Sequence, residues 1–335
     1  MPSKLKLAFV GAGGIARSHL GGLVKLEDVE LAGFCDVNKE AAGSAATEYG
    51  GRPFDDPDRM MDDVKPDAVF ICLPPFAHGD AEMAAIRRKI PFFVEKPISN
   101  DLALSQKIAS EAEKARLLTC AGYMNRYRRS INRVRELLRD DAAVIVHGGW
   151  IGRVPGNVKT GIGAWWIQKS KSGGQFVEQV THTVDIVRYL CGEAREVYAM
   201  ATKGFVKGVE NYTIEDASHV VINLERGTIV NLYSSCAVSV GGGVSLTVHA
   251  RNFTARFTGW EHSVAITKSE LETENIKGEE GIFEIEDRAF LDAVKNGDAS
   301  KVRSSYPDAL KTLAITLAAN ESMEVGRPVN VKSKT

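Results

Sequence analysis

The chain has 335 residues, with 42 basic and 43 acidic side chains. This length exceeds what one hydrophobic core usually spans, so we expect two domains with a cleft between them. The near-neutral charge gives no electrostatic reason to expect nucleic acid or a membrane surface as a partner, which leaves a small molecule as the better default.

The N-terminus and the cysteines indicate a soluble, cytoplasmic protein. Residues 1–6 lead directly into a strand-like segment with no export signal. No segment approaches the roughly 18 uninterrupted apolar residues of a membrane-spanning helix. The five cysteines are far apart and include no CxxC pair, which favours buried, reduced thiols over disulfides or a zinc site. The histidines are scattered, and no metal is predicted.

The first 120 or so residues alternate short apolar runs with helical stretches, a pattern typical of βαβ units and a parallel sheet. Residues 80–88 are one such helical stretch. The runs predicted as strands are 5–10, 29–35, 68–73, 91–94 and 117–122. We therefore predict an α/β chain with an N-terminal Rossmann dinucleotide-binding domain over residues 1–123.

From residue 124 to residue 335 the pattern is that of an α+β domain. A helical stretch over 130–139 leads to a strand at 144–150. Two hairpins then predict a large, mostly antiparallel open sheet; their strands are 217–224 with 228–234, and 245–250 with 253–258. Helices are predicted over 284–295 and 307–324, and the C-terminal helix is a candidate to pack back on the first domain.

A glycine-rich turn follows the first predicted strand. Its sequence, Gly11-Ala12-Gly13-Gly14-Ile15-Ala16, matches G-x-G-x-x-[G/A] and opens a helical stretch that begins at Ile15. Gly11 permits the tight turn and Gly13 lets the backbone approach a pyrophosphate at the helix N-terminus. The alternative is a plain strand-to-helix turn.

Asp36 indicates which dinucleotide binds. It lies 25 residues after Gly11, at the end of the second predicted strand. A carboxylate there accepts hydrogen bonds from the adenosine ribose and repels a 2′-phosphate. No arginine follows directly, so NAD is favoured over NADP, although Lys39 leaves NADP open.

Residues that directly follow the other strands are further ligand candidates, because ligands of open α/β sheets gather at the carboxyl ends of the strands. Leu73, Pro74 and His78 follow the third predicted strand, and Glu95-Lys96-Pro97 follows the fourth. Pro97 disfavours helical geometry at Lys96, which favours a lysine extended into the cleft. The alternative is an ordinary solvated lysine.

A helix is predicted over residues 175–191, directly after Gly173-Gly174. Its polar side chains share one arc, namely Glu178, Thr181, His182, Asp185 and Tyr189. By spacing alone, such an arc is more typical of a solvated helix face than of a catalytic one. A carboxylate one turn before a histidine can nonetheless orient the imidazole for general-base work. Cation binding by this arc is a further alternative.

These motifs together resemble those of the Gfo/Idh/MocA oxidoreductase family over essentially the whole chain. The resemblance rests on the glycine motif, on Glu95-Lys96-Pro97 after a Pro-Pro-x-x-His loop, on Asn125-Arg126 after the fifth strand, on Gly173-Gly174 with Glu178, His182 and Asp185, and on the ending from Asp308-Ala309-Leu310 to Gly326-Arg327-Pro328. It implies an NAD(P)-dependent dehydrogenase or reductase for a sugar, a polyol or a sugar derivative.

The resemblance also implies a role for each site residue. His182 takes the hydroxyl proton, Lys96 steadies the developing alkoxide, and Glu178 partners the histidine and touches the substrate. The predicted cofactor contacts are Gly11, Gly13, Gly14, Ile15, Asp36, Leu73, Pro74, His78, Glu95 and Lys96. The predicted substrate contacts are Arg126, Trp165, Glu178 and Asp185.

Two departures from the family pattern bear on the substrate. Glu178 stands where the family usually has an aspartate, and it reaches one methylene further. Trp165-Trp166 stands where the family often has Trp-Arg, eight residues before the glycine pair. An aromatic face suits the C–H surface of a sugar, and a buried packing role is the alternative.

Two other functions stay open at this point. One is an NAD-dependent, redox-neutral glycoside hydrolase or lyase, and the other is a non-catalytic, nucleotide-sensing regulatory protein, against which Lys96 and His182 argue. The resemblance further implies a homodimer or homotetramer that pairs through the open sheet face, for which residues 228–234 and 245–249 are strand candidates.

Overall fold

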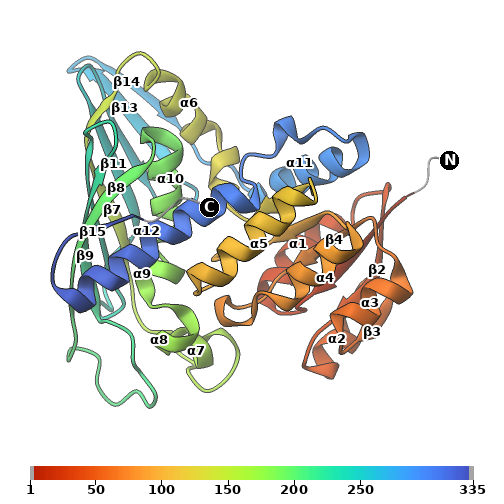
Figure 1. The fold of residues 1–335 in the computed structure, drawn as a ribbon. Helices are drawn as coiled ribbons and strands as arrows, with labels where there is room; N and C mark the ends of the chain where they lie inside the picture. Colours follow the sequence, from red (N-terminus) through yellow and green to blue (C-terminus); the bar gives the residue numbers. More distant parts are fainter. Residues whose placement is uncertain (1–3, 332–335) are drawn as a thin grey trace. The chain divides into compact units, whose positions relative to one another are not determined.

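The computed structural model describes residues 4–331, and these divide into two compact units (Figure 1). The first unit contains residues 4–124 and 281–310, and the second contains residues 125–280 and 311–331. The sequence predicts that every residue from 124 onward belongs to the second domain, whereas in the structure residues 281–310 group with the first unit. Among the described residues, no helix is long and apolar enough to cross a membrane.

The first unit contains a parallel six-stranded sheet of order β3-β2-β1-β4-β5-β6. The strands are β1 (Leu5–Val10), β2 (Val29–Cys35), β3 (Arg52–Phe54), β4 (Ala68–Ile71), β5 (Phe92–Val94) and β6 (Thr119–Ala121). The strand order reverses between β1 and β4, which marks the place where an open sheet binds its ligand. The predicted Rossmann sheet is confirmed, and the sequence missed only the short edge strand β3.

A stack of phenylalanines explains why the distant helix α11 (Ile282–Asn296) belongs to the first unit. Phe9 and Phe93 stack on either side of Phe70, at ring distances of 4.9 and 5.0 Å. Phe290 of α11 meets Phe70 and Phe93 edge to face and is fully buried. The other helices of this unit are α1 (Gly14–Leu23), α2 (Lys39–Tyr49), α3 (Pro57–Val64), α4 (Asp80–Arg88) and α5 (Leu102–Lys114).

The second unit contains a nine-stranded sheet of order β14-β13-β12-β11-β7-β10-β9-β8-β15. Its strands are β7 (Ala143–Ile151), β8 (Ala194–Thr202), β9 (Ala217–Leu224), β10 (Ile229–Ser235), β11 (Gly243–Ala250), β12 (Thr254–Thr258), β13 (Ser263–Ser269), β14 (Glu272–Ile276) and β15 (Val329–Asn330). Among the described strands of this sheet, only β7 and β10 pair in parallel, so the predicted, mostly antiparallel sheet is confirmed. The sequence missed β8, β13, β14 and β15.

The two faces of this sheet differ in what covers them (Figure 1). One face packs its alternate apolar side chains against α6 (Arg129–Leu137), α10 (Thr181–Cys191) and the later turns of α12 (Tyr306–Val325). The other face leaves large apolar side chains exposed within this chain, among them Ile145, Met200 and Ile229. The period-2 alternation along each strand therefore produces one core face and one open face.

The helix predicted over residues 175–191 forms as two helices, α9 (Gln175–Glu178) and α10. The carbonyl oxygen of Gln175 accepts from the N–H groups of both Gln179 and Val180, so the helical register is interrupted there. The predicted arc is also buried rather than solvated, since Glu178, Thr181 and Asp185 are each no more than 5 % exposed. The solvated-face interpretation of the spacing was therefore wrong.

Candidate active site

The glycine turn after β1 forms an open cradle at the start of α1. Gly11 has φ of +92°, and a Cβ atom there would lie 2.2 Å from the carbonyl oxygen of Cys72, so only glycine fits. Around Gly13 and Gly14, nothing lies within 4 Å of where a Cβ would stand. Gly13 caps α1 without a side-chain hydrogen bond, which leaves the first N–H groups of the helix for an anion. This geometry fits a pyrophosphate.

Asp36 is held ready at the end of β2. The N–H groups of Ala12 and Asn38 each donate to one of its carboxylate oxygens, at 2.8 Å. A carboxylate has about four acceptor positions, so two remain for the ribose hydroxyls. Lys39, the residue that left NADP open, is paired with Asp55 at 2.9 Å. The arrangement favours a free ribose over a 2′-phosphate.

His78 holds the loop that follows β4. Its Nδ1 lies 2.6 Å from Glu82 and its Nε2 lies 3.1 Å from the carbonyl oxygen of Leu73, and the ring is buried. Both ring nitrogens of His78 face protein atoms, and the cofactor contact predicted for this residue stays a prediction. His78 fixes Leu73 and Pro74, which are half-buried beside it.

Glu95 lies beneath the lysine that follows β5. One carboxylate oxygen accepts from the backbone N–H of Lys96 at 3.0 Å, and the other lies 3.0 Å from Nε2 of His19. The Glu95 side chain is almost fully buried, while Lys96 is half-buried. Glu95 thus anchors the backbone of Lys96, and its predicted cofactor contact stays a prediction.

Arg126 and Asp185 form a buried ion pair in the second unit. Nε and Nη2 of Arg126 donate to the two oxygens of Asp185 at 2.8 and 2.6 Å, and Thr312 donates to the same carboxylate at 2.9 Å. Both charged side chains are no more than 4 % exposed. The sequence predicted substrate contacts for each, whereas the structure joins them to each other and so fixes the middle of α10.

Trp166, which the sequence analysis did not select, holds Glu178. Its indole N–H donates to Glu178 Oε2 at 2.5 Å, and both side chains are buried. Trp165, the predicted substrate contact, is only half-buried. Trp166 also packs edge to face on Trp150 at 6.2 Å. The two tryptophans therefore have different roles. Trp166 orients the carboxylate that precedes His182, and Trp165 is the predicted substrate contact.

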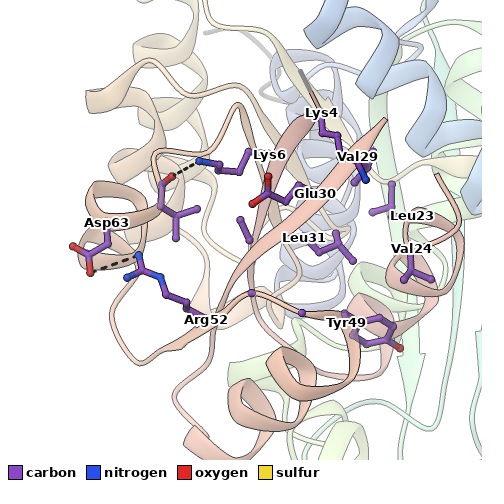
Figure 2. Close-up of a pocket in the computed structure, with 14 residues that line it drawn as sticks. Lys4, Lys6, Leu23, Val24, Val29, Glu30, Leu31, Tyr49, Arg52 and Asp63 are labelled. Atoms are coloured by element: carbon purple, nitrogen blue, oxygen red, sulfur yellow. Dashed lines mark hydrogen bonds and ion pairs between the residues drawn. The ribbon is translucent and has the colours of Figure 1, made fainter. Parts of the chain in front are cut away.

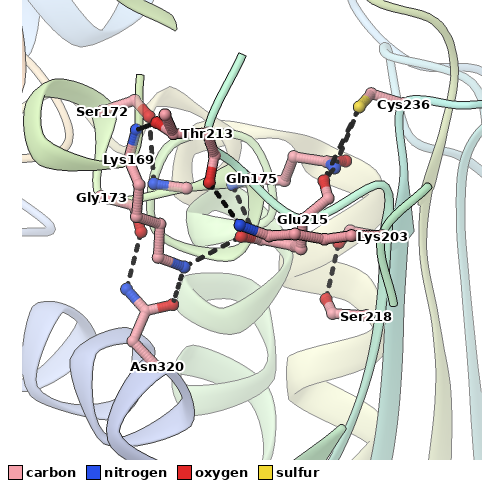
Figure 3. Close-up of polar contacts among 12 residues, drawn as sticks. Lys169, Ser172, Gly173, Gln175, Lys203, Thr213, Glu215, Ser218, Cys236 and Asn320 are labelled. Atoms are coloured by element: carbon pink, nitrogen blue, oxygen red, sulfur yellow. Dashed lines mark hydrogen bonds and ion pairs between the residues drawn. The ribbon is translucent and has the colours of Figure 1, made fainter. Parts of the chain in front are cut away.

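Figure 3 shows a network of polar contacts around Lys169, Gly173 and Glu215. Gly174 has φ of +91°, and a Cβ there would lie 2.5 Å from Lys169 Nζ, so the absent side chain makes room for the Lys169–Glu215 ion pair at 2.9 Å. Glu215 also accepts from the N–H of Gln175, and Asn320 donates to the carbonyl oxygen of Gly173. This network fixes the start of α9, which carries Glu178.

One cavity of the first unit lies away from these residues. It has a volume of about 550 Å³ and lies at the amino ends of β1 and β2, where Lys4, Lys6 and Glu30 line it (Figure 2). The glycine turn and Asp36 lie at the opposite, carboxyl ends of the same strands. Ligands of open α/β sheets bind at the carboxyl ends, so we assign the cofactor to the glycine cradle and not to this cavity.

The residues that the sequence analysis missed share one property: each acts through another residue. His19 holds Glu95, Trp166 holds Glu178, and Glu215 holds the glycine pair. His19 had a usable signal, since it lies on the apolar side of α1 with Ala16 and Leu20. Within residues 4–331, no group of three His, Cys, Asp or Glu side chains is placed to hold a metal ion.

The fold and the cradle are those of a dinucleotide-binding protein. The family model described as "Oxidoreductase family, NAD-binding Rossmann fold" matches residues 5–123, and the Gfo/Idh/MocA C-terminal domain model matches residues 135–256. The chain therefore belongs to the Gfo/Idh/MocA family of NAD-binding oxidoreductases, as its motifs predicted.

Individual relatives span the chain. Glucose-6-phosphate 3-dehydrogenase of Bacillus subtilis strain 168 is 24% identical over 262 residues, which cover 74% of this chain and 73% of the relative. The scyllo-inositol 2-dehydrogenase (NAD(+)) of the same organism is 25% identical, and the match covers 100% of this chain and 98% of the relative. Levoglucosan dehydrogenase, solved with NADH and levoglucosan, matches with a TM-score of 0.87 at 16% identity, over 98% of this chain and 100% of that one.

The two ends of the glycine cradle differ in what a methyl group would do. Gly11→Ala introduces a Cβ at positive φ against the Cys72 carbonyl, so we expect the first unit to lose at least about 2 kcal/mol of stability. Gly14→Ala meets open space, so its stability should stay within about 1 kcal/mol of wild type while its affinity for NAD falls. Urea unfolding followed by circular dichroism, with calorimetric titration of NAD, checks both. Equal loss of stability in the two variants would contradict the assignment.

Asp36→Ala should weaken NAD binding by about 10- to 100-fold, because hydrogen bonds to a charged acceptor contribute about 1.5–3 kcal/mol. Binding of NADP should weaken far less, since the variant also removes the repulsion of the 2′-phosphate. Calorimetric titration with both dinucleotides measures the ratio. Asp62→Ala removes an exposed carboxylate of the same unit and is the matched control. An unchanged ratio of NAD affinity to NADP affinity in Asp36→Ala would contradict the assignment of Asp36 to the ribose.

Proposed function

We propose that this protein is an NAD-dependent dehydrogenase that oxidises a secondary hydroxyl of a sugar, a polyol or a sugar derivative, or the reductase that runs in the opposite direction. The observation that carries the proposal is the open glycine cradle beside an Asp36 carboxylate fixed by two backbone N–H groups. The substrate class is supported by relatives named for glucose-6-phosphate and scyllo-inositol, both of which bear secondary hydroxyls.

The oxidation requires a base that accepts the hydroxyl proton and a hydrogen-bond donor for the hydroxyl oxygen. When bound, NAD supplies the nicotinamide that accepts a hydride from the carbon that carries the hydroxyl. His182 accepts the hydroxyl proton, and the Lys96 ammonium donates a hydrogen bond to the oxygen as negative charge develops on it. The substrate carbon becomes the carbon of a carbonyl group, and the proton passes from His182 to solvent.

Glu178 is the substrate-selecting carboxylate of this proposal. Trp166 donates to Glu178 Oε2 and fixes the direction of the carboxylate, which in this proposal also accepts from a neighbouring hydroxyl of the substrate. A buried carboxylate discriminates against a substrate that lacks the matching hydroxyl, because the hydrogen bond to that hydroxyl is then lost. We retain Trp165 as an aromatic contact for the sugar, whereas Arg126 and Asp185 act by holding α10.

We also propose a homodimer or homotetramer that assembles through the open face of the nine-stranded sheet. Support comes from the large apolar side chains on that face, including Ile145, Met200 and Ile229. The cytoplasmic location and the absence of a nucleic-acid partner stay predictions from the sequence.

His182→Ala and Lys96→Ala should each lower kcat/KM for the sugar or polyol by about 100- to 10,000-fold, the usual contribution of a positioned acid or base. The measurement follows NADH by its absorbance with NAD and a panel of sugars, polyols and aryl glycosides. Lys114→Ala removes an exposed lysine of the first unit and should behave as wild type.

The same panel separates the other two functions. Release of an aglycone without net NADH would move the assignment to the redox-neutral hydrolase or lyase. NAD binding with no turnover of any compound, and unchanged biological effect of both variants, would favour the regulatory protein.

Trp166→Phe keeps an aromatic ring but removes the N–H that holds Glu178. We expect kcat/KM to fall by about 10-fold or more, since a hydrogen bond to a buried carboxylate is lost, and NAD binding to stay unchanged. Trp150→Phe removes an indole N–H from the same cluster without contacting Glu178, and it is the matched control. Equal effects of the two substitutions on kcat/KM would show that only packing matters.

A further inference from the structure

A histidine joins two carboxylates inside the first unit. His19 Nδ1 lies 2.7 Å from Asp287 Oδ1, and His19 Nε2 lies 3.0 Å from Glu95 Oε1. His19 is fully buried, Glu95 and Asp287 are each no more than 3 % exposed, and the rings of Phe70, Phe93 and Phe283 surround the imidazole. Three elements far apart in sequence thus meet at one ring, namely α1, the turn after β5, and α11.

Both nitrogens of this ring face acceptors. An ionised carboxylate only accepts hydrogen bonds, so only the imidazolium can donate to both neighbours at once. Burial alone lowers the pKa of His19, but the carboxylates of Asp287 and Glu95 outweigh it and raise that pKa from 6.5 to about 10. Glu284 is a further acid near Asp287. His19 is therefore a cation across the physiological range.

Glu95 connects His19 to the backbone of Lys96, the residue that follows it after β5. Its second oxygen accepts the backbone N–H of Lys96, and a Cβ on Gly122 would lie 2.6 Å from its first oxygen, so glycine makes room for the carboxylate at the end of β6. A continuous chain of bonds therefore runs from α1, whose first turn forms the pyrophosphate cradle, through His19 and Glu95 to Lys96.

We propose that His19 is a positioning residue that fixes the distance between the pyrophosphate cradle and the Lys96 turn, so that both ends of a dinucleotide are held in register. The inference rests on the proposed function in one respect, that Lys96 acts at the nicotinamide end. Stability alone is a poor explanation of the triad, because well-packed apolar residues often replace a buried ion group at no cost. Such residues would not hold the Lys96 backbone through a directed hydrogen bond.

The test compares NAD with ADP, which lacks the nicotinamide half. In His19→Gln, the affinity for NAD should fall by about 10- to 100-fold while the affinity for ADP changes by less than about 2-fold, because ADP needs only the cradle and Asp36. Asp287→Asn leaves the His19–Glu95 bond in place, so its NAD affinity should stay within about 3-fold of wild type. Calorimetric titration of the full chain gives both constants, at a temperature below every variant's melting transition.

Ile108→Ala is the control for mere destabilisation. Ile108 is fully buried in α5 of the same unit, and its truncation should lower stability by about 2–5 kcal/mol without changing the NAD-to-ADP ratio. If His19→Gln does not fold, the double variant His19→Gln/Asp287→Asn replaces it in the comparison of NAD with ADP. The double variant leaves Glu95 as the one carboxylate of the triad.

A second readout follows the charge of His19. Its folded pKa lies above the unfolded value, so the stability it contributes is complete below about pH 6.5 and is lost as the pH rises toward 10. The difference in melting temperature between wild type and His19→Gln should therefore narrow over that interval.

Each outcome has one meaning. A selective loss of NAD affinity in His19→Gln supports the inference, even if no sugar is turned over. Equal weakening of NAD and ADP, or a ratio that matches that of Ile108→Ala, overturns it and leaves the proposed function standing. A wild-type protein that binds neither nucleotide overturns the proposed function instead.

Discussion

The close approach of two strand ends is the constraint on which the rest of the first unit depends. Where β1 ends, its backbone must turn away from β4 within one residue, and Gly11 lies so near the Cys72 carbonyl that no Cβ fits. The N–H of Gly11 bonds to Cys35 at the end of β2, so three strand ends are joined there. The direction of α1, the opening of the cradle and the place of Asp36 follow from that turn.

Buried charge organises both units in the same way, because in each unit charged groups hold the backbone that carries the residues assigned to the chemistry. In the second unit, Arg126 binds both oxygens of Asp185 in the middle of α10, and the Lys169–Glu215 pair lies over Gly174 at the start of α9. Such groups are costly to bury unless every polar atom finds a partner. Their geometry leaves few alternatives for the backbone that carries Glu178 and His182, and this is the precision that acid–base chemistry requires.

How far the sequence predicts this molecule depends on the range of the interaction. Local patterns succeed: the glycine turn, the Asp36 position and the strands 5–10 and 29–35 are read from residues next to one another. The break between α9 and α10 escapes prediction, since the carbonyl of Gln175 accepts two N–H groups with no proline or glycine to mark it. Glu95 and Asp287, the partners of His19, lie 76 and 268 residues away along the chain, and no local sequence pattern predicts a contact over that distance.

Trp166 determines how the carboxylate that precedes His182 is held. Sequence patterns of the family often provide an arginine where this chain has Trp166, and an arginine beside Glu178 would pair with its charge bidentately. The indole has a single donor, so it makes one hydrogen bond to Glu178 Oε2 and orients the carboxylate without bringing a charge of its own. Glu178 is also one methylene longer than the usual aspartate. The longer side chain and the neutral donor act together: the Glu178 carboxylate reaches further than an aspartate would, and the indole orients it without adding a positive charge.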